Sequence, residues 1–396
     1  MRVTQSLVQT QFLTGLNTLE SNLAQTQAQL TTGLAFSSPA QNPAAAGSVN
    51  TYNQVLAQST QYAANANSAQ TNLNIEDNAL TQIQNQLQTL RSLALQANSG
   101  TISPQDLGAI ASQAAQIQKS LIGLANTQNG NGDYIFAGYA SQTAPFAQAA
   151  GGASYAGDQG QILAQIAAGQ TIPVGDNGDT VFNQIKTGNG TFTVTANAGN
   201  TGTGLIGATT VANPAAYTGG SYAIKFTAPN AYQVLDATNA VVASGTYADG
   251  QAIGFAGLQV SLSGSPAAGD SFAVAPSGNQ SLFTTVQNLV DTLNSAAGTR
   301  VTPQIDNAIA GSINDIDQAL GHTSTVQTAV GGRLNAITTQ LAIATTQQTQ
   351  LKQTISSLQS LDYPSAITSL TNQQTSLSAA MQAYTLTAGL SLFKYI

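Results

Sequence analysis

The sequence predicts a mainly α protein with an inserted β domain. Both chain ends form a long antiparallel helical bundle or coiled coil, and the middle forms an antiparallel, β-sandwich-like insert. Near both ends of the 396-residue chain, apolar residues recur at alternating steps of three and four, which is the spacing of a coiled-coil seam. In the middle, apolar and polar residues alternate in short segments separated by Gly, Asn, Asp and Pro, which is typical of strands and turns.

The N-terminal half predicts three helices. The first ends near Gly33, and a segment rich in Pro, Gly and Ser then excludes continuous helix. The second carries a seam in which only Ser59 and Glu76 are polar. A third begins after Ser103, which suits the cap position, with Pro104 at the first helical position. The seam of the second helix comprises Tyr52, Val55, Ser59, Tyr62, Ala66, Ala69, Leu73, Glu76, Leu80, Ile83, Leu87, Leu90, Ala94 and Ala97.

The C-terminal part repeats this pattern. Thr302-Pro303 predicts a helix start, and a break is expected near Pro364 before the last helix. The seam between these two points comprises Leu334, Ile337, Leu341, Ala344, Leu351, Ile355 and Leu358. The sequence therefore predicts a terminal-helix assembly domain (1–42 and 363–396), a helical rod domain (43–146 and 279–362) and a β domain (147–278). A β-hairpin-like segment is expected near 129–146, with Tyr134–Phe136 paired as a strand against the bundle.

The composition argues against catalysis and against several kinds of partner. Charged residues are 6% of the chain, against about 25% in typical domains, and the net charge of −7 disfavours nucleic acid. With no Cys and His322 as the sole His, no catalytic triad or His-pair metal site can be complete in one chain. Asp176 and Asp179 favour a turn over a shared cation site. We therefore expect no enzyme activity, no cofactor, no metal and no membrane span.

The terminal helices carry almost no charge, which predicts burial by other subunits. Glu20 is the only charged residue between Thr4 and Leu30, and residues 363–392 contain none, whereas a solvated helix normally has a charged face. We expect residues 1–40 and 365–396 to be largely disordered in an isolated monomer. The expected subunit-assembly residues are Leu16, Leu19, Leu23, Leu30, Leu370, Leu377, Met381, Tyr384, Leu390, Leu392, Phe393 and Tyr395. The expected rod-core residues are Leu73, Leu80, Leu87, Leu334, Leu341, Tyr134 and Phe136.

Four segments resemble the flagellin superfamily. The segment QLTTGLAFSSPAQNPAAA (29–46) is similar to its conserved Leu-x-Thr-Gly and Pro loop, although Leu34, Ala35, Gln41 and Asn42 replace the charged residues usual there. The other segments, which resemble the hook-associated protein 3 branch, are GNGDYIFAGYASQTAPF (130–146), GGRLNAI (331–337) and MQAYTLTAGLSLFKYI (381–396).

That resemblance implies a structural protein of the bacterial flagellum. It implies a homo-oligomeric ring between hook-associated protein 1 and flagellin, with an export chaperone before type III secretion to the cell exterior. The N-terminus lacks the pattern of a cleaved signal peptide, which agrees with that route.

Two other functions stay open at the level of sequence. The first is flagellin itself, the filament subunit. The second is a secreted carbohydrate-binding protein, for which Tyr217, Tyr222, Tyr232 and Tyr247 of the β domain are the candidate contacts.

Overall fold

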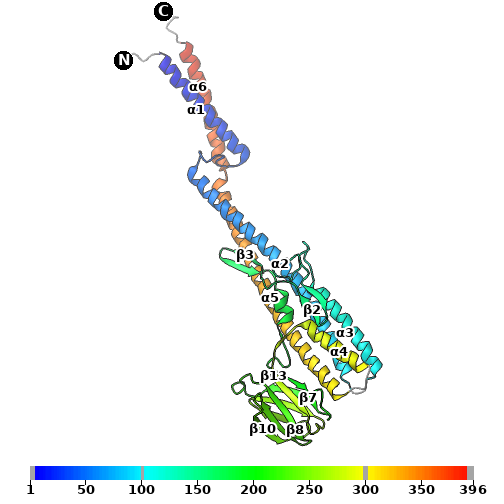
Figure 1. The fold of residues 1–396 in the computed structure, drawn as a ribbon. Coiled ribbons are helices and arrows are strands. Elements are labelled where there is room, and N and C mark those ends of the chain that lie inside the picture. The colour runs from blue at the N-terminus through cyan, green and yellow to red at the C-terminus, as the bar shows by residue number, and fades with distance from the viewer. Residues whose placement is uncertain (1–4, 100–101, 298–301, 390–396) are drawn as a thin grey trace, which may run out of the picture. The chain divides into compact units, whose positions relative to one another are not determined.

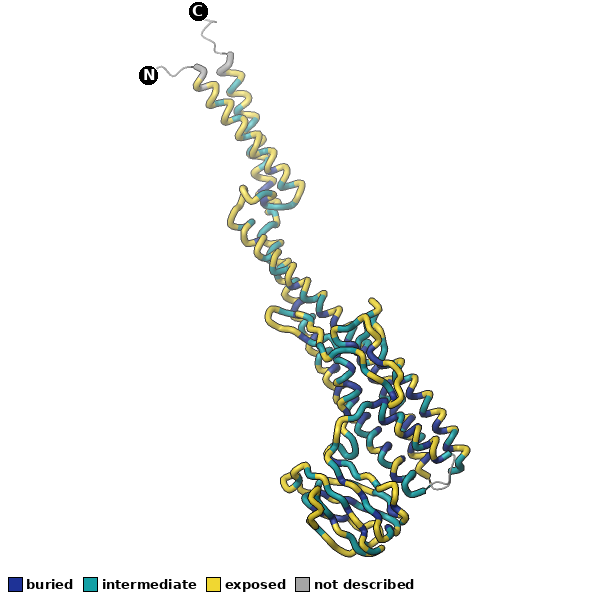
Figure 2. The backbone as a smooth tube through the Cα atoms, viewed as in Figure 1, coloured by how far each residue is buried: buried dark blue, intermediate teal, exposed yellow. Residues whose placement is uncertain are grey.

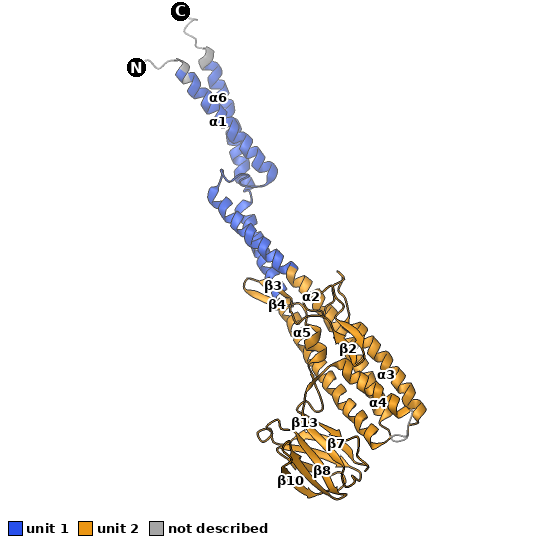
Figure 3. Cartoon of the chain, viewed as in Figure 1, with its two compact units in different colours: residues 1–64, 340–396 blue, residues 65–339 orange. Residues whose placement is uncertain are grey.

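The computed structural model describes residues 5–99, 102–297 and 302–389. Helices occupy both ends of the chain and antiparallel strands occupy the middle, as predicted (Figure 1). The chain divides into two compact units (Figure 3). We call residues 1–64 with 340–396 the smaller unit and residues 65–339 the larger unit.

The helices begin and end close to the expected positions. Gly33 has φ +71°, the left-handed conformation that commonly ends a helix, and it directly follows the first helix. The second helix begins at Pro43, where the missing backbone N–H has no cost. The described helices are α1 (Gln5–Thr32), α2 (Pro43–Ala97), α3 (Pro104–Ala125), α4 (Leu282–Ala297), α5 (Pro303–Gln359) and α6 (Tyr363–Gly389). The sequence did not single out α4.

In the smaller unit, α1 packs against α6. The rings of Phe12 and Tyr384 stack with centroids 5.3 Å apart. At the other end of this pair, the loop after α1 joins the loop before α6. Ala35 N donates to Gln359 O at 2.7 Å, and Leu361 N donates to Gly33 O at 3.0 Å. These bonds hold the two helix ends together without charged side chains.

In the larger unit, α2 to α5 bury their apolar sides among one another. Figure 2 shows buried residues concentrated on these helices, whereas α1 and α6 are mainly exposed or half-buried. Every seam position of α2 from Ala66 to Ala97 is buried, including polar Glu76. A regular spacing of three and four places these side chains on one helix face, so periodicity alone identifies the core-facing side.

The start of α3 is capped as the sequence predicts. The Ser103 hydroxyl accepts from Asp106 N at 3.2 Å and donates to the Asp106 carboxylate at 2.7 Å.

Replacing Ser103 with Ala should destabilise the larger unit by about 1 kcal/mol, because a helical N–H loses its partner. Urea unfolding followed by circular dichroism measures this. Ser112→Ala, the same change on the exposed side of α3, is the control. Equal effects of the two substitutions would show that the cap is not responsible.

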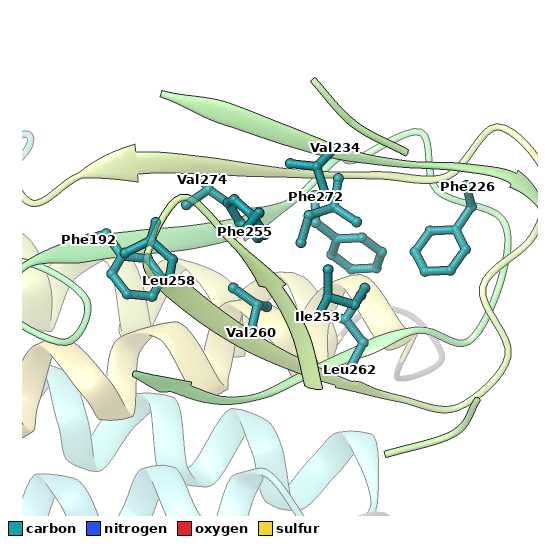
Figure 4. Packing of buried hydrophobic residues seen from close by; sticks show 11 residues of the cluster. Phe192, Phe226, Val234, Ile253, Phe255, Leu258, Val260, Leu262, Phe272 and Val274 are labelled. Carbon is teal, nitrogen blue, oxygen red and sulfur yellow. The ribbon is translucent and has the colours of Figure 1, made fainter. Parts of the chain in front are cut away.

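The β domain consists of two antiparallel sheets that enclose an apolar core (Figure 4). A five-stranded sheet has the order β10-β9-β8-β13-β6, and a three-stranded sheet has the order β11-β12-β7. Phe226 and Phe272 of the larger sheet lie in one cluster with Val260 and Leu262 of the smaller sheet. The strands are β6 (Phe192–Ala196), β7 (Leu205–Val211), β8 (Tyr222–Ala228), β9 (Ala231–Asp236), β10 (Val241–Thr246), β11 (Ala252–Phe255), β12 (Leu258–Ser263) and β13 (Ser271–Pro276).

Short hairpins join this domain to the helices. The pairs are β1 (Phe146–Ala149) with β2 (Gly152–Tyr155), and β3 (Leu163–Ala167) with β4 (Gln170–Pro173). A π-helical turn, η1 (Asp179–Asn183), follows them. The last pair is β5 (Ile185–Lys186) with β14 (Asn279–Gln280), at the point where the chain enters and leaves the domain.

The segment at 129–145 differs from the expected strand. Tyr134–Phe136 does not form a strand; Tyr134 makes one isolated bridge with Gln128, and turns follow it up to β1. Gly132 and Gly138 have φ of +85° and +69°, which extended strands do not accommodate. The segment is therefore a series of turns, and the buried side chain of Phe136 anchors it.

Candidate functional site

The terminal helices α1 and α6 carry the described residues that were expected to mediate assembly. Within one chain these side chains are only partly covered, and Met381 is 55% exposed. Leu390, Leu392, Phe393 and Tyr395 lie outside the described residues. The half-buried members of the set are Leu16, Leu19, Leu23, Leu30, Leu370, Leu377 and Tyr384.

Further apolar side chains on α1 and α6 are exposed, outside the set that the heptad pattern predicts. Leu386 is 72% exposed and Leu7 is 58% exposed. Ile367 and Leu13 are also exposed. They lie outside the heptad seam, so a search for one apolar stripe passes over them. The sequence feature that could have identified them is the near absence of charged residues around the whole helix. Burial against other chains would stabilise an assembly by about 25 cal/mol per Å² of apolar surface.

Neutral side chains organise the loop between α1 and α2. Gln41 Oε1 accepts from Ser37 N at 2.6 Å, and Asn42 Oδ1 accepts from Ala45 N at the start of α2. Phe36, a residue of this loop, is buried. Gln41 and Asn42 are two of the positions at which the sequence departs from the charged pattern of the superfamily. Amide side chains therefore supply the hydrogen bonds that fix this loop.

The rod-core residues occupy two kinds of environment. Leu73, Leu80 and Leu87 on α2 are fully buried, whereas Leu334 and Leu341 on α5 are half-buried. Phe136 is fully buried, and Tyr134 is half-buried.

An aromatic cluster anchors the 129–145 turns and β1 to the bundle. We define the aromatic cluster as Phe136, Phe146, Phe182 and Phe283. Phe182 meets the rings of Phe136 and Phe146 edge to face, with centroids 5.1 and 5.3 Å apart. Phe283 on α4 lies 4.9 Å from Phe146. Such pairs add stability beyond the burial of area. The cluster therefore joins three chain segments that are far apart in sequence.

Hydrogen bonds from α5 hold the β domain in place within the larger unit. Asn307 is buried; it accepts from Ile206 N at 2.7 Å and donates to Gly204 O at 2.9 Å. Asp315 accepts from Gly188 N at 2.7 Å, and burial raises the pKa of this carboxyl group. These contacts position the domain relative to α5 within the larger unit.

The candidate polar residues of the sequence are engaged in local contacts within the larger unit. In the described ranges, no group of three or more His, Asp or Glu side chains is arranged to hold a metal ion. His322 Nε2 contacts Thr180 O at 2.9 Å, and Asp179 accepts from the amide groups of Asn183 and Gln184. Asp176 pairs with Arg333 at 2.8 Å. Within the described part of the chain, no helix has both the length and the apolar character required to cross a membrane.

The tyrosines considered for carbohydrate binding contribute to the packing of the β domain. Tyr217, Tyr222, Tyr232 and Tyr247 all pack against the apolar core of the β domain. Tyr222 lies edge to face with Phe255, and Tyr247 does so with Phe226. The Tyr247 hydroxyl donates to Gly264 O at 2.9 Å.

Two family models match the chain. The bacterial flagellin N-terminal helical region matches residues 3–141, and the D2-like domain of flagellar hook-associated protein 1 matches residues 195–276. Flagellar hook-associated protein 3 from Salmonella typhimurium is 32% identical over 185 residues, or 47% of this chain. The chain spans 58% of the length of that curated relative.

Two solved structures are similar over most of the chain. FlgL from Xanthomonas campestris is 36% identical, with a TM-score of 0.72; the match covers 77% of this chain and 99% of that one. Flagellar hook associated protein-3 from Legionella pneumophila is 30% identical, with a TM-score of 0.74, covering 78% and 98% of the two chains.

Proposed function

Because this chain belongs to the flagellar hook-associated protein 3 family, we propose that it forms the ring that joins the hook to the flagellin filament. Family membership makes it a structural protein of the flagellum and not an enzyme. In our proposal, hook-associated protein 1 is the neighbour on the hook side and flagellin is the neighbour on the filament side. An export chaperone would bind the chain before type III secretion to the cell exterior.

The uncharged terminal helices are the observation that carries this proposal. In one chain, α1 and α6 cover each other along a single seam, and apolar residues such as Leu386 and Met381 remain exposed on other sides. A stable two-helix end in water would normally carry charge on those sides. Burial between neighbouring subunits of a ring would remove this apolar surface from water. We further propose that the terminal helices, 1–42 and 363–396, form the assembly domain. The β domain is not required for this assembly.

A strain that lacks this protein tests the proposal. We expect cells with hooks but without filaments, and monomeric flagellin in the growth medium, because flagellin would have no junction ring on which to assemble. Electron microscopy and immunoblotting of the medium measure these two outcomes. Normal filaments in the deletion strain would contradict a junction role. A second strain, which lacks flagellin, separates the junction role from that of a filament subunit. If this protein is a junction protein, it should remain on the hooks of those cells although they have no filament.

Complementation with point variants tests the assembly surface. Leu386→Lys should fail to restore filaments, because the new charge would be buried between subunits. Val242→Lys is the matched control, since Val242 is an exposed apolar residue of the β domain. Secretion of both variants is checked first. Full restoration of filaments by Leu386→Lys would rule out this face of α6 as an assembly surface.

A further inference from the structure

Three ionisable side chains from distant parts of the chain meet inside the larger unit. Glu76 belongs to the α2 seam, Asp176 to the loop between β4 and η1, and Arg333 to α5. Glu76 is 1% exposed and Asp176 is 9% exposed. Arg333 Nη2 donates to Asp176 Oδ1 at 2.8 Å, and Asp176 N donates to Glu76 Oε1 at 3.2 Å. The loop is therefore tied to both long helices through one cluster of charges.

The cluster contains two carboxyl groups and only one cation. Asp176 Oδ1 accepts from Arg333 and also from Gln161 Nε2. The remaining oxygens, Glu76 Oε2 and Asp176 Oδ2, are buried and have no donor, and Arg333 Nη1 also lacks a partner. Two ionised carboxylates would leave both oxygens unsatisfied and place a net negative charge in the interior. Both outcomes are strongly unfavourable away from water.

One proton on Glu76 resolves both problems. A protonated Glu76 Oε2 becomes a donor, and Asp176 Oδ2 is the unsatisfied acceptor of the adjacent side chain. The proton also leaves one carboxylate opposite one guanidinium, so the cluster becomes neutral. Among the described residues, Asp176 and Arg333 are the charged groups that act on Glu76. Burial first, and the charge of Asp176 second, raise the pKa of Glu76 well above its ordinary value, while Arg333 opposes them.

We propose that Glu76 holds a proton that it donates to Asp176 and, with Arg333, forms a pH-sensitive clamp that fastens residues 174–178 to α2 and α5. The clamp extends to neighbouring segments: Gly178 N donates to Phe136 O at 2.7 Å, and Val174 N donates to Ile162 O. A cavity of about 130 Å³ lies beside it, lined in part by Asn72, Asp133 and Asp176. The cluster therefore controls how firmly the turns and hairpins around this cavity are attached to the bundle.

The direction of the pH effect follows from the raised pKa of Glu76. Between the ordinary value, about 4.3, and the folded value, the folded state binds the proton more tightly than the unfolded state does. This stabilisation is complete at low pH and is lost as the pH rises through the folded pKa. Burial also raises the pKa of Asp306 and Asp315, with the same sign. Only a comparison with a Glu76 variant therefore isolates the clamp.

Glu76→Gln in the full chain tests this energetic consequence. The amide keeps the shape, accepts from Asp176 N and donates to Asp176 Oδ2 without a titrating proton. We expect the ratio of the folding equilibrium constants, variant over wild type, to rise with pH. The rise is up to tenfold for each pH unit and ends at the pKa of Glu76 in the folded state. Urea unfolding at intervals from pH 5 to pH 9 measures it. Parallel pH profiles for the two proteins would overturn the proposal.

The proton itself can be observed directly, because the chain contains only two glutamates, Glu20 and Glu76. Selective ¹³C-glutamate labelling should give two carboxyl resonances, which the Glu76→Gln variant assigns. We expect the Glu76 resonance to retain the shift of a protonated acid at pH 6, where a freely solvated glutamate is ionised. An ionised Glu76 at that pH would overturn the proposal, whatever the stability of the variants.

Two aspartate variants test the partner. Asp176→Asn should lower the pH at which the Glu76 resonance titrates, because it removes the neighbouring negative charge. Asp179→Asn, three residues along the same loop, should leave that titration unchanged. If both variants shift the Glu76 resonance equally, or neither does, Asp176 is not the acceptor of the Glu76 proton.

Discussion

Replacing Phe136 with Ala is expected to destabilise the larger unit by about 3–5 kcal/mol, the usual cost of removing a buried aromatic ring. Phe136 is 0% exposed and contacts Phe182 edge to face. Its backbone also accepts hydrogen bonds from Gly178 N and from the Tyr155 hydroxyl, so the surrounding segments are tied together and are unable to fill the cavity by collapse. The free energy of unfolding in urea, followed by circular dichroism, measures the loss.

Tyr139→Ala is the matched control for this substitution. Tyr139 is three residues further along the same turns but is 67% exposed. Its hydroxyl makes one hydrogen bond, to Gln161 O at 3.1 Å. We expect a change in the free energy of unfolding of less than about 1 kcal/mol. A Phe136→Ala protein as stable as Tyr139→Ala would mean that the aromatic cluster does not anchor this segment.

Asp270→Ala is expected to destabilise the β domain by roughly 3–5 kcal/mol, because backbone N–H groups lose their buried acceptor. The Asp270 side chain is 2% exposed and accepts three backbone hydrogen bonds, from Thr201 N, Gly202 N and Ala267 N, at 2.8–3.0 Å. Alanine would leave these N–H groups without their acceptor, at about 1–3 kcal/mol each, and partial hydration would reduce the sum. Native-state amide exchange of β8 and β13 measures the loss within the domain.

Asp249→Ala is the control for Asp270→Ala. Asp249 accepts one backbone hydrogen bond, from Gly264 N at 2.7 Å, and it is exposed. Its removal should change the same exchange rates by less than a factor of about ten, because water can replace an exposed acceptor. Equal acceleration of β8 and β13 exchange in both variants would show that the burial of Asp270 contributes nothing.

Local and periodic features were predictable from the sequence. The seam from Ala66 to Ala97, the cap at Ser103 and the helix stop at Gly33 each depend on residues close together in the chain. The alternating pattern of the middle region likewise predicted the two antiparallel sheets. In all these cases, local backbone preference and tertiary packing favour the same structure.

The features that were missed depend on contacts between distant residues. Glu76 was recognised as a polar residue in an apolar seam, but its partners Asp176 and Arg333 are 100 and 257 positions away. Tyr134–Phe136 was expected to pair as a strand, but the positive φ angles of Gly132 and Gly138 turn the chain on both sides of it. The subunit-assembly residues remain a prediction, because an interface is a property of several chains.

The pairing of β5 with β14 brings the two ends of the β domain side by side. Thr187 N donates to Gly278 O, and Ser277 N donates to Thr191 O, so the outgoing and returning strands are linked side by side. An insertion whose two ends are neighbours can be lengthened, exchanged or excised in evolution without cutting the core of its host. The helical scaffold and this appendage are therefore free to evolve at different rates, and a foreign domain with closely spaced ends could be grafted at the same point.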